Sequence, residues 1–283
     1  MPDIVLSPIQ PYSLAQSITG SDPTRRIGNG VLELVFEVDG HPTCAQVWQR
    51  RDGDLVARVD GEACDATIEH LRFVLATDVD HGTFLALADG DPLLRPLVSQ
   101  RRGLRPRRTS TVAHALVQAM AGQLITAREA RLIEHRIVAL CSRPYAGLLL
   151  PPTVEGLRAV SAVELTRTGL APRRAAALAR VVRTLDVERL RTVTTDRAVA
   201  RIQRERTLGP WSAGLIALSG LGRYEHGMVG DLGLIRLCGN LLGREATSDD
   251  TRRLLEPYGD WAALAGIHLM RHPLARQRTA HAA

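Results

Sequence analysis

The segment Arg206-Thr-Leu-Gly-Pro-Trp-Ser-Ala213 decides the fold of this chain. Leu208-Gly209-Pro210 predicts a tight turn after a polar helix, and Ser212 begins a second, apolar helix. The two helices and their turn therefore form a hairpin at about residues 200–220. The second helix would present unpaired backbone N–H groups and the positive end of its dipole. Its start is thus predicted to bind an anion, and a phosphodiester fits there without any base contact.

An aspartate follows this hairpin. Asp231 comes twenty residues after Trp211, at the start of a helix that we expect over residues 232–242. Taken alone, an aspartate at this place is an ordinary helix N-cap. Only its combination with the hairpin makes it a candidate for chemistry.

The first part of the chain has the pattern of a β-sheet. Residues 31–38 are rich in β-branched and apolar side chains, and residues 44–49 and 55–59 are the next two predicted strands. Asp39-Gly40 ends the first of them in a turn suited to a hairpin. After Gly61 the apolar residues recur at helical spacing. We therefore expect an N-terminal domain over residues 1–86, an antiparallel sheet with helices packed on it.

The remainder, residues 87–283, is predicted to be mostly α-helical, in two subdomains, with no further strand. Thr126-x-x-Glu129 is a capping box that begins one of these helices. Gly122-Gln123-Leu124 then lies in the short loop before it, where Leu124 would be exposed. The fold class is α+β. The further helices are predicted at 161–168, 172–185, 195–205, 212–220, 232–242, 248–256 and 260–271.

The charged residues exclude several classes of enzyme. The 36 basic residues outnumber the 30 acidic ones, and all 36 are arginine. Without lysine there is no side chain for a Schiff base, for pyridoxal phosphate or for a Gly-Lys-Ser/Thr phosphate loop. The arginine-dense stretch 100–109 is interpreted either as a solvated linker or as part of a phosphate-binding surface. The candidate phosphate contacts are Arg101, Arg102, Arg105, Arg107, Arg108, Arg173, Arg174, Arg252 and Arg253.

Other sequence features point to a soluble, cytoplasmic protein. The four cysteines have no zinc or iron–sulfur spacing, and we expect them to be reduced and mostly buried. No run of 18 apolar residues occurs, so we expect no membrane partner. Residues 1–10 contain Asp3 and no basic cluster, so we expect no secretory signal.

The hairpin and Asp231 together resemble the helix-hairpin-helix DNA glycosylases, specifically the DNA-3-methyladenine glycosylase II type. Other segments match in the right order, over essentially the full length of the chain. They are Pro11-Tyr12 with the early sheet, Ala121-Gly-Gln-Leu-Ile125, and Leu170-Ala-Pro-Arg-Arg-Ala-Ala-Ala177.

The resemblance implies a role for each matching residue. Asp231 matches the catalytic aspartate, and Trp211 matches an aromatic of the base pocket. Leu215 occupies the position of a pocket tyrosine. Gln123 and Leu124 match the loop that enters the duplex and fills the gap left by a flipped nucleotide. DNA-binding residues of the hairpin are implied at Thr207, Leu208, Gly209 and Ser212.

The chain departs from the family pattern at two places that matter for chemistry. Thr207 replaces the first glycine of the usual Pro-Gly-x-Gly turn, and a β-branched residue resists a positive φ. Bifunctional relatives carry a sugar-attacking lysine where this chain has Trp211. The resemblance therefore implies no lyase activity and no required cofactor, although relatives hold a monovalent cation at the hairpin carbonyls.

We thus expect a monomeric, monofunctional glycosylase of base excision repair. It would flip alkylated purines, of the 3-methyladenine or 7-methylguanine type, out of damaged double-stranded DNA and leave an abasic site. Two alternatives remain open. One is a non-catalytic helix-hairpin-helix DNA-binding protein, and the other is a glycosylase for deaminated bases.

Overall fold

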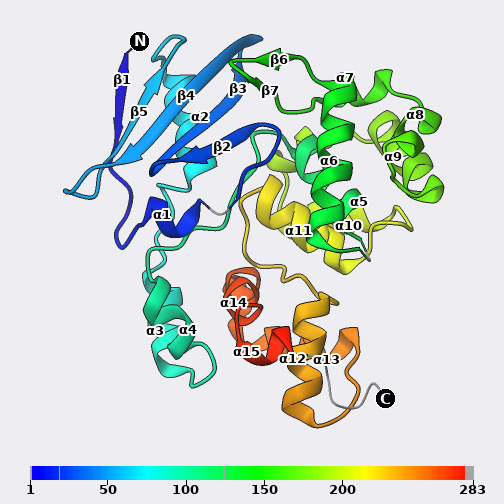
Figure 1. The fold of residues 1–283 in the computed structure, drawn as a ribbon. Helices are drawn as coiled ribbons and strands as arrows, with labels where there is room; N and C mark the ends of the chain where they lie inside the picture. The colour runs from blue at the N-terminus through cyan, green and yellow to red at the C-terminus, as the bar shows by residue number, and fades with distance from the viewer. Residues whose placement is uncertain (1, 19, 124, 278–283) are drawn as a thin grey trace.

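A computed structural model describes residues 2–18, 20–123 and 125–277. An N-terminal sheet domain lies against a larger helical part, whose last helices form a separate layer (Figure 1). In the described residues no helix is both long and apolar enough to cross a membrane.

The N-terminal domain is a five-stranded antiparallel sheet with strand order β1-β5-β4-β3-β2. Its strands are β1 (Asp3–Leu6), β2 (Arg25–Gly28), β3 (Val31–Val38), β4 (His41–Gln49) and β5 (Leu55–Val59). The short helix α1 (Leu14–Ser17) follows β1, and α2 (Asp65–Leu75) covers one face of the sheet. The alternation of the strands places their apolar side chains on that face, where they form one core with Leu71 and Val74 of α2.

The three predicted strands of this domain are confirmed. The sequence analysis did not predict β1 and β2. β2 pairs with β3 through the turn at Asn29 and Gly30, which have φ values of 50° and 75°. Such positive φ values at both central residues are typical of a two-residue hairpin, and Asn-Gly is a strong sequence signal for it. The strand could therefore have been predicted from Asn29-Gly30. β1 pairs with β5, far along the chain, so no local turn signals it.

The middle of the chain forms a helical layer beside the sheet. Its helices are α5 (Val112–Gly122), α6 (Ala127–Cys141), α7 (Val154–Ala159), α8 (Ala162–Arg167), α9 (Pro172–Thr184), α10 (Thr195–Gln203) and α11 (Pro210–Gly220), with a 3-10 turn at Glu188–Thr192. The predicted capping box at Thr126 and Glu129 is confirmed. A small hairpin, β6 (Pro144–Tyr145) with β7 (Leu148–Leu149), corrects the expectation that no strand follows the N-terminal domain. It consists of two residues per strand, too few for a pattern of alternation to be visible.

The chain ends in a second helical layer. It contains α12 (Leu232–Leu242), α13 (Ser248–Leu255), α14 (Ala262–Leu269) and α15 (Pro273–Arg276), with a 3-10 turn at Glu256–Trp261. Two earlier helices, α3 (Gly82–Gly90) and α4 (Arg95–Val98), join this layer, followed by a 3-10 turn at Ser99–Arg101. Phe84 and Trp261 pack within the same core, with ring centroids 5.9 Å apart.

This packing bears on where the domains divide. The predicted boundary between residues 86 and 87 falls inside α3. Phe84 and Leu85 precede that boundary but share a core with Leu264 of α14. We therefore propose that the division lies just before α3, so that the whole helix belongs to the helical part.

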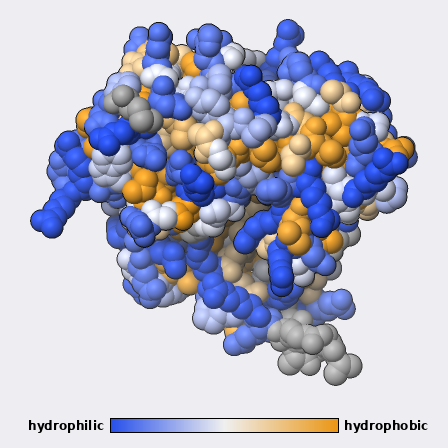
Figure 2. All heavy atoms as spheres, turned by 45° about the horizontal axis from the view of Figure 1, so that its top comes forward, coloured by the Kyte–Doolittle hydropathy of each residue, from blue (hydrophilic) through white to orange (hydrophobic). Residues whose placement is uncertain are grey.

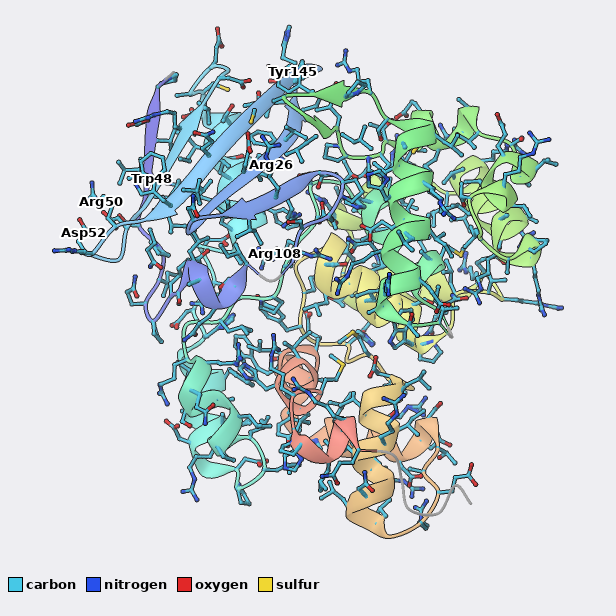
Figure 3. The ribbon with its side chains drawn as sticks, in the orientation of Figure 1. Arg26, Trp48, Arg50, Asp52, Arg108 and Tyr145 are labelled. Atoms are coloured by element: carbon cyan, nitrogen blue, oxygen red, sulfur yellow. The ribbon has the colours of Figure 1, made fainter. Side chains whose placement is uncertain are left out.

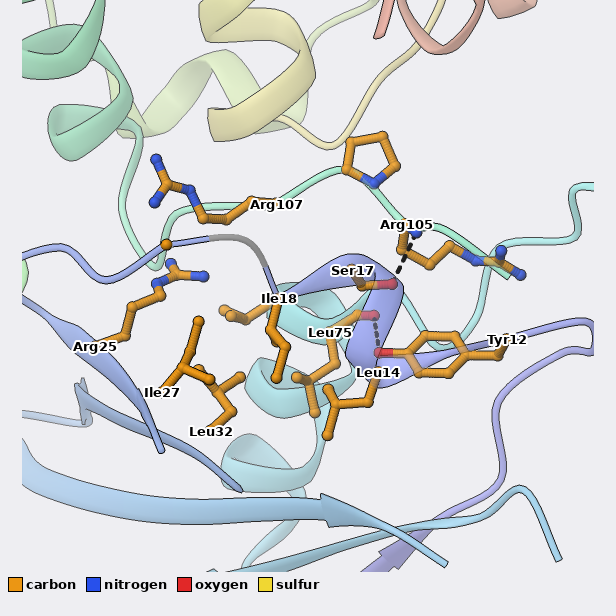
Figure 4. A pocket seen from close by; sticks show the side chains of 13 residues that line it. Tyr12, Leu14, Ser17, Ile18, Arg25, Ile27, Leu32, Leu75, Arg105 and Arg107 are labelled. Carbon is orange, nitrogen blue, oxygen red and sulfur yellow. Dashed lines mark hydrogen bonds between the residues drawn. The ribbon is translucent and has the colours of Figure 1, made fainter. Parts of the chain in front are cut away.

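Two arginines of the stretch 100–109 are buried where the parts of the chain meet. Arg105 is 2% exposed, and its guanidinium donates to the carbonyls of Ile9 (3.0 Å) and Val79 (3.4 Å). Its backbone N–H donates to Ser17 beside a cavity of about 20 Å³ (Figure 4), which has room for little more than one water molecule. Arg105 therefore joins the loop that follows β1 to the segment that follows α2.

Arg108 has a similar role between the sheet domain and the helical part. It is 3% exposed and donates to the carbonyls of Phe73 (3.0 Å) and Gly222 (3.1 Å). Figure 3 shows it between the sheet domain and α11. Both interpretations of the stretch 100–109 are thus wrong for Arg105 and Arg108, since buried guanidinium groups reach neither solvent nor phosphate. Arg102 and Arg107 form ion pairs with Asp89 (2.8 Å) and Asp22 (3.2 Å).

Candidate active site

The helix hairpin forms as predicted, from α10, a turn and α11. The N–H of Leu208 donates to the carbonyl of Glu205 (2.8 Å) and tightens the turn. Gly209 is the N-cap of α11, and Pro210 is its first residue. Proline suits this position because an N–H group there would have no partner within the helix. Gly209 and Pro210 are both exposed. The positive end of α11 therefore faces solvent at the tip of the hairpin.

Asp231 is presented by a glycine turn at the start of α12. Gly230 has a φ of +86°, which side chains with a Cβ rarely adopt, and its N–H donates to Thr251 Oγ1 (2.9 Å). The carboxylate caps α12, because its Oδ1 accepts from the N–H groups of Gly233 (2.8 Å) and Leu234 (3.4 Å). The ordinary N-cap interpretation is therefore correct, but it accounts for only one oxygen.

The second carboxylate oxygen joins Asp231 to the hairpin. The indole Nε1 of Trp211 donates to Asp231 Oδ2 at 3.0 Å. Two residues twenty positions apart, on α11 and at the start of α12, are thus brought into direct contact. The hydrogen bonds from Trp211, Gly233 and Leu234 together hold the half-buried carboxylate in one orientation.

Neighbouring residues define the space around this pair. A Cβ at Gly122, the last residue of α5, would lie 3.0 Å from Cη2 of Trp211, so the indole packs closely against the end of α5. A Cβ at Gly233 would lie 3.6 Å from Cγ of Met270, which places Met270 over the first turn of α12. Leu215 is half-buried and packs against both helical cores. Met270 was not predicted to lie near this site, because nothing in the sequence distinguishes it from a core residue.

Gln123 links the end of α5 to the hairpin. Its Nε2 donates to the carbonyl of Thr207 (2.7 Å) and to Oγ of Ser212 (2.9 Å). Three residues predicted to bind DNA are therefore brought together. Leu124, the predicted wedge, lies outside the residues that the structure describes.

Burial limits how two of the predicted DNA-binding residues of the hairpin could contact DNA. Leu208 and Ser212 are each 2% exposed. Leu208 packs in the core under the hairpin, and the hydroxyl of Ser212 is occupied by Gln123. Their side chains are thus too enclosed to touch DNA, and any contact would come from their backbone atoms.

The carbonyl groups of the hairpin turn are only partly suited to bind a monovalent cation. The carbonyls of Glu205, Thr207 and Gly209 already accept hydrogen bonds from Leu208 N, Gln123 Nε2 and Ala213 N. Each of these oxygens has at most one lone pair left for a cation. Among the described residues, no cluster of His, Cys, Asp and Glu has the geometry of a metal site.

Comparison with known proteins finds similar proteins of the kind that the motifs resemble. A scan against family models finds no match. The chain is 28% identical over 263 residues to a "probable bifunctional transcriptional activator/DNA repair enzyme AlkA" from Mycobacterium tuberculosis, covering 87% of this chain. The match covers 49% of that relative, so the chain spans about half its length.

Solved structures decide the fold. A 3-methyladenine DNA-glycosylase from Archaeoglobus fulgidus superposes with a TM-score of 0.81 at 20% identity, covering 95% of this chain and 97% of that one. The chain has the fold of the helix-hairpin-helix DNA glycosylases. An 8-oxoguanine glycosylase/lyase from Clostridium acetobutylicum shares this glycosylase fold, with a TM-score of 0.76, 17% identity, and 94% and 95% of the two chains covered. A complex of the clostridial enzyme with double-stranded DNA also matches, with a TM-score of 0.70, 18% identity, and 87% and 85% covered.

Proposed function

We propose that this chain is a monofunctional DNA glycosylase that removes alkylated purines from double-stranded DNA. The observation that carries the proposal is the contact between Asp231 and Trp211 next to the exposed start of α11. A fixed carboxylate and an aromatic ring, close to a site for a phosphate, are the groups that base removal requires. The relatives' names and the shared fold support this assignment.

The chemistry we propose is hydrolysis of the N-glycosidic bond. The base leaves with the electron pair of that bond, and positive charge develops on the sugar. Asp231 stabilises that charge electrostatically and orients the water whose oxygen bonds to C1′ and whose proton is released. An alkylated purine is already cationic and leaves as a neutral base, so one carboxylate suffices without a strong general acid.

We propose that DNA is held through the hairpin. A phosphate would accept hydrogen bonds from the N–H groups at the start of α11, where the helix dipole favours negative charge. The target base would leave the stack and lie against Trp211, whose electron-rich face attracts a cationic ring. Leu215 and Met270 would form the apolar wall of the pocket. We propose that the protein acts as a monomer.

Lyase activity is not part of the proposal. A lyase of this fold needs an amine that attacks the sugar, and the sequence contains no lysine. The indole of Trp211 cannot form a Schiff base. The experiment that tests the function is therefore incubation with methylated duplex DNA, followed by detection of the released base and of alkali-sensitive sites.

Replacing Trp211 by phenylalanine tests the hydrogen bond to Asp231. The variant W211F keeps an aromatic face for the base but has no donor for Asp231 Oδ2. Loss of one hydrogen bond to a charged group costs roughly 1.5 kcal/mol or more. We expect the single-turnover rate to fall about tenfold, with little change in affinity for abasic-site DNA. An unchanged rate would show that the indole N–H has no part in positioning Asp231.

Replacing Gln123 by alanine tests the link between α5 and the hairpin. The Thr207 carbonyl and the Ser212 hydroxyl lose their donor. We expect the free energy of unfolding to fall by about 1 kcal/mol, and affinity for abasic-site DNA to fall about tenfold because the hairpin is no longer held in place. Binding titrations measure this effect. Gln203→Ala, at the exposed end of α10, is the matched control and should change neither quantity.

A further inference from the structure

Helix α6 presents a basic face that the sequence did not single out. Arg128, Arg131, Leu132 and His135 recur at intervals of three and four residues, and all four are exposed. The opposite face of the helix is buried, through Ile137 and Val138 among others. The exposed face therefore has no packing role that would explain its arginines.

Neither Arg128 nor Arg131 is engaged by an acidic side chain, a property that they share with other surface arginines such as Arg173 and Arg253. Within the described residues, no carboxylate oxygen lies within 4.0 Å of the guanidinium of Arg128 or Arg131. By contrast, Arg102 and Arg252, two of the predicted phosphate contacts, pair with Asp89 (2.8 Å) and Asp249 (2.9 Å). The charge on α6 is thus available to a ligand.

A hollow of about 360 Å³ lies between this face and the loop Ser21–Pro23. Two acidic residues, Asp22 and Glu134, line it, but both carboxylates are almost fully buried and bonded to other groups of the protein. Burial alone would raise the pKa of Asp22, whereas Arg25 (3.1 Å) and Arg107 (3.2 Å) hold that pKa at about 2. The carboxylate of Glu134 accepts hydrogen bonds from His114 and Gln118, both at 2.8 Å.

The charge that remains at the mouth of the hollow is positive. It comes from Arg128 and Arg131, with His135 beside them. Hydrophilic side chains cover much of the molecular surface in Figure 2, so a charged face is unremarkable by itself. An unpaired basic face at the rim of a hollow is a more specific feature, and it fits an anion.

The position of α6 indicates which anion would bind to this face. The helix begins at Ala127, only a few residues after Gln123, which is bonded to the hairpin. From Arg128 to His135 the face is about 10 Å long, at 1.5 Å per residue. A DNA strand carries one phosphate about every 3.4 Å of helix axis, so this face can reach about three of them.

We propose that the α6 face formed by Arg128, Arg131 and His135 binds phosphates of the DNA backbone. It supplies part of the salt-dependent affinity, in addition to any contacts from the arginines that the sequence pattern indicated. This inference rests on the proposed function, since it assumes that duplex DNA lies against the hairpin.

The test is the salt dependence of DNA binding. The double variant Arg128→Ala/Arg131→Ala is compared with the wild-type chain and with Arg102→Ala/Arg252→Ala, which has the same net charge. The ligand is a short duplex with an abasic-site analogue, titrated at several salt concentrations. Each lost phosphate contact lowers the slope of log K against log salt by about 0.9.

We expect the α6 variant to lose nearly two units of slope and about tenfold in affinity at physiological salt, while the control keeps the wild-type slope. The proposal is overturned if the α6 variant keeps that slope, or if the control loses as much. Failure of the proposed function looks different, since the wild-type chain would then show no preference for the abasic duplex and release no base.

Discussion

Replacing Asp231 by asparagine is expected to reduce base release by about 100-fold or more. The variant keeps the size of the side chain but removes the negative charge that we propose stabilises the sugar in the transition state. Removal of one electrostatic stabiliser typically costs a factor of about 10² to 10³ in rate. The new amide group would also place a donor opposite Trp211 Nε1, so the hydrogen bond that orients the side chain is lost.

This variant should remain folded, which makes the result interpretable. Asparagine is as good an N-cap as aspartate, and its oxygen can still accept from Gly233 N. We expect the affinity for abasic-site DNA to stay close to that of the wild type. The matched control is Asp260→Asn, an exposed aspartate outside the site. Equal single-turnover rates for D231N and the wild type would remove Asp231 from the mechanism.

Replacing Arg108 by alanine is expected to destabilise the protein by about 3 kcal/mol. The guanidinium bonds two carbonyls, at Phe73 and Gly222, and lies 5.0 Å from the centre of the Phe73 ring. Hydrogen bonds from a charged group contribute roughly 1.5–3 kcal/mol, and a buried carbonyl left without its donor adds a penalty. Urea denaturation followed by circular dichroism measures the loss.

The control for this prediction is Arg102→Ala in the same stretch of sequence. Arg102 forms an exposed ion pair with Asp89, and such pairs contribute about 1 kcal/mol or less. A small, equal loss in the two variants would contradict the structural role assigned to Arg108. If R108A were instead stably folded and defective only in DNA binding, the original phosphate-contact interpretation would be restored.

The comparison of sequence with structure shows which features are locally encoded. The turn at Leu208-Gly209-Pro210, the capping box at Thr126 and the N-cap at Asp231 depend on residues within a few positions of one another. Local backbone preferences decide such features, so they could be predicted. The strand β2 was missed although Asn29-Gly30 signals it.

Contacts between distant residues could not be predicted in the same way. The hydrogen bond of Trp211 to Asp231 and that of Gln123 to Ser212 depend on how helices pack, which spacing alone does not specify. The burial of Arg105 and Arg108 is the clearest failure. Arginine is rarely buried, so a sequence dense in arginine suggests solvent or phosphate rather than backbone carbonyls as partners.

The central claim is tested most directly by the products formed from duplex DNA that contains 3-methyladenine or 7-methylguanine. We predict that the wild-type chain releases the methylated base and leaves an abasic site, which breaks only after treatment with alkali. Tight, salt-dependent binding without any base release would contradict the claim and favour a non-catalytic DNA-binding protein. Strand breaks that appear without alkali would contradict the monofunctional mechanism.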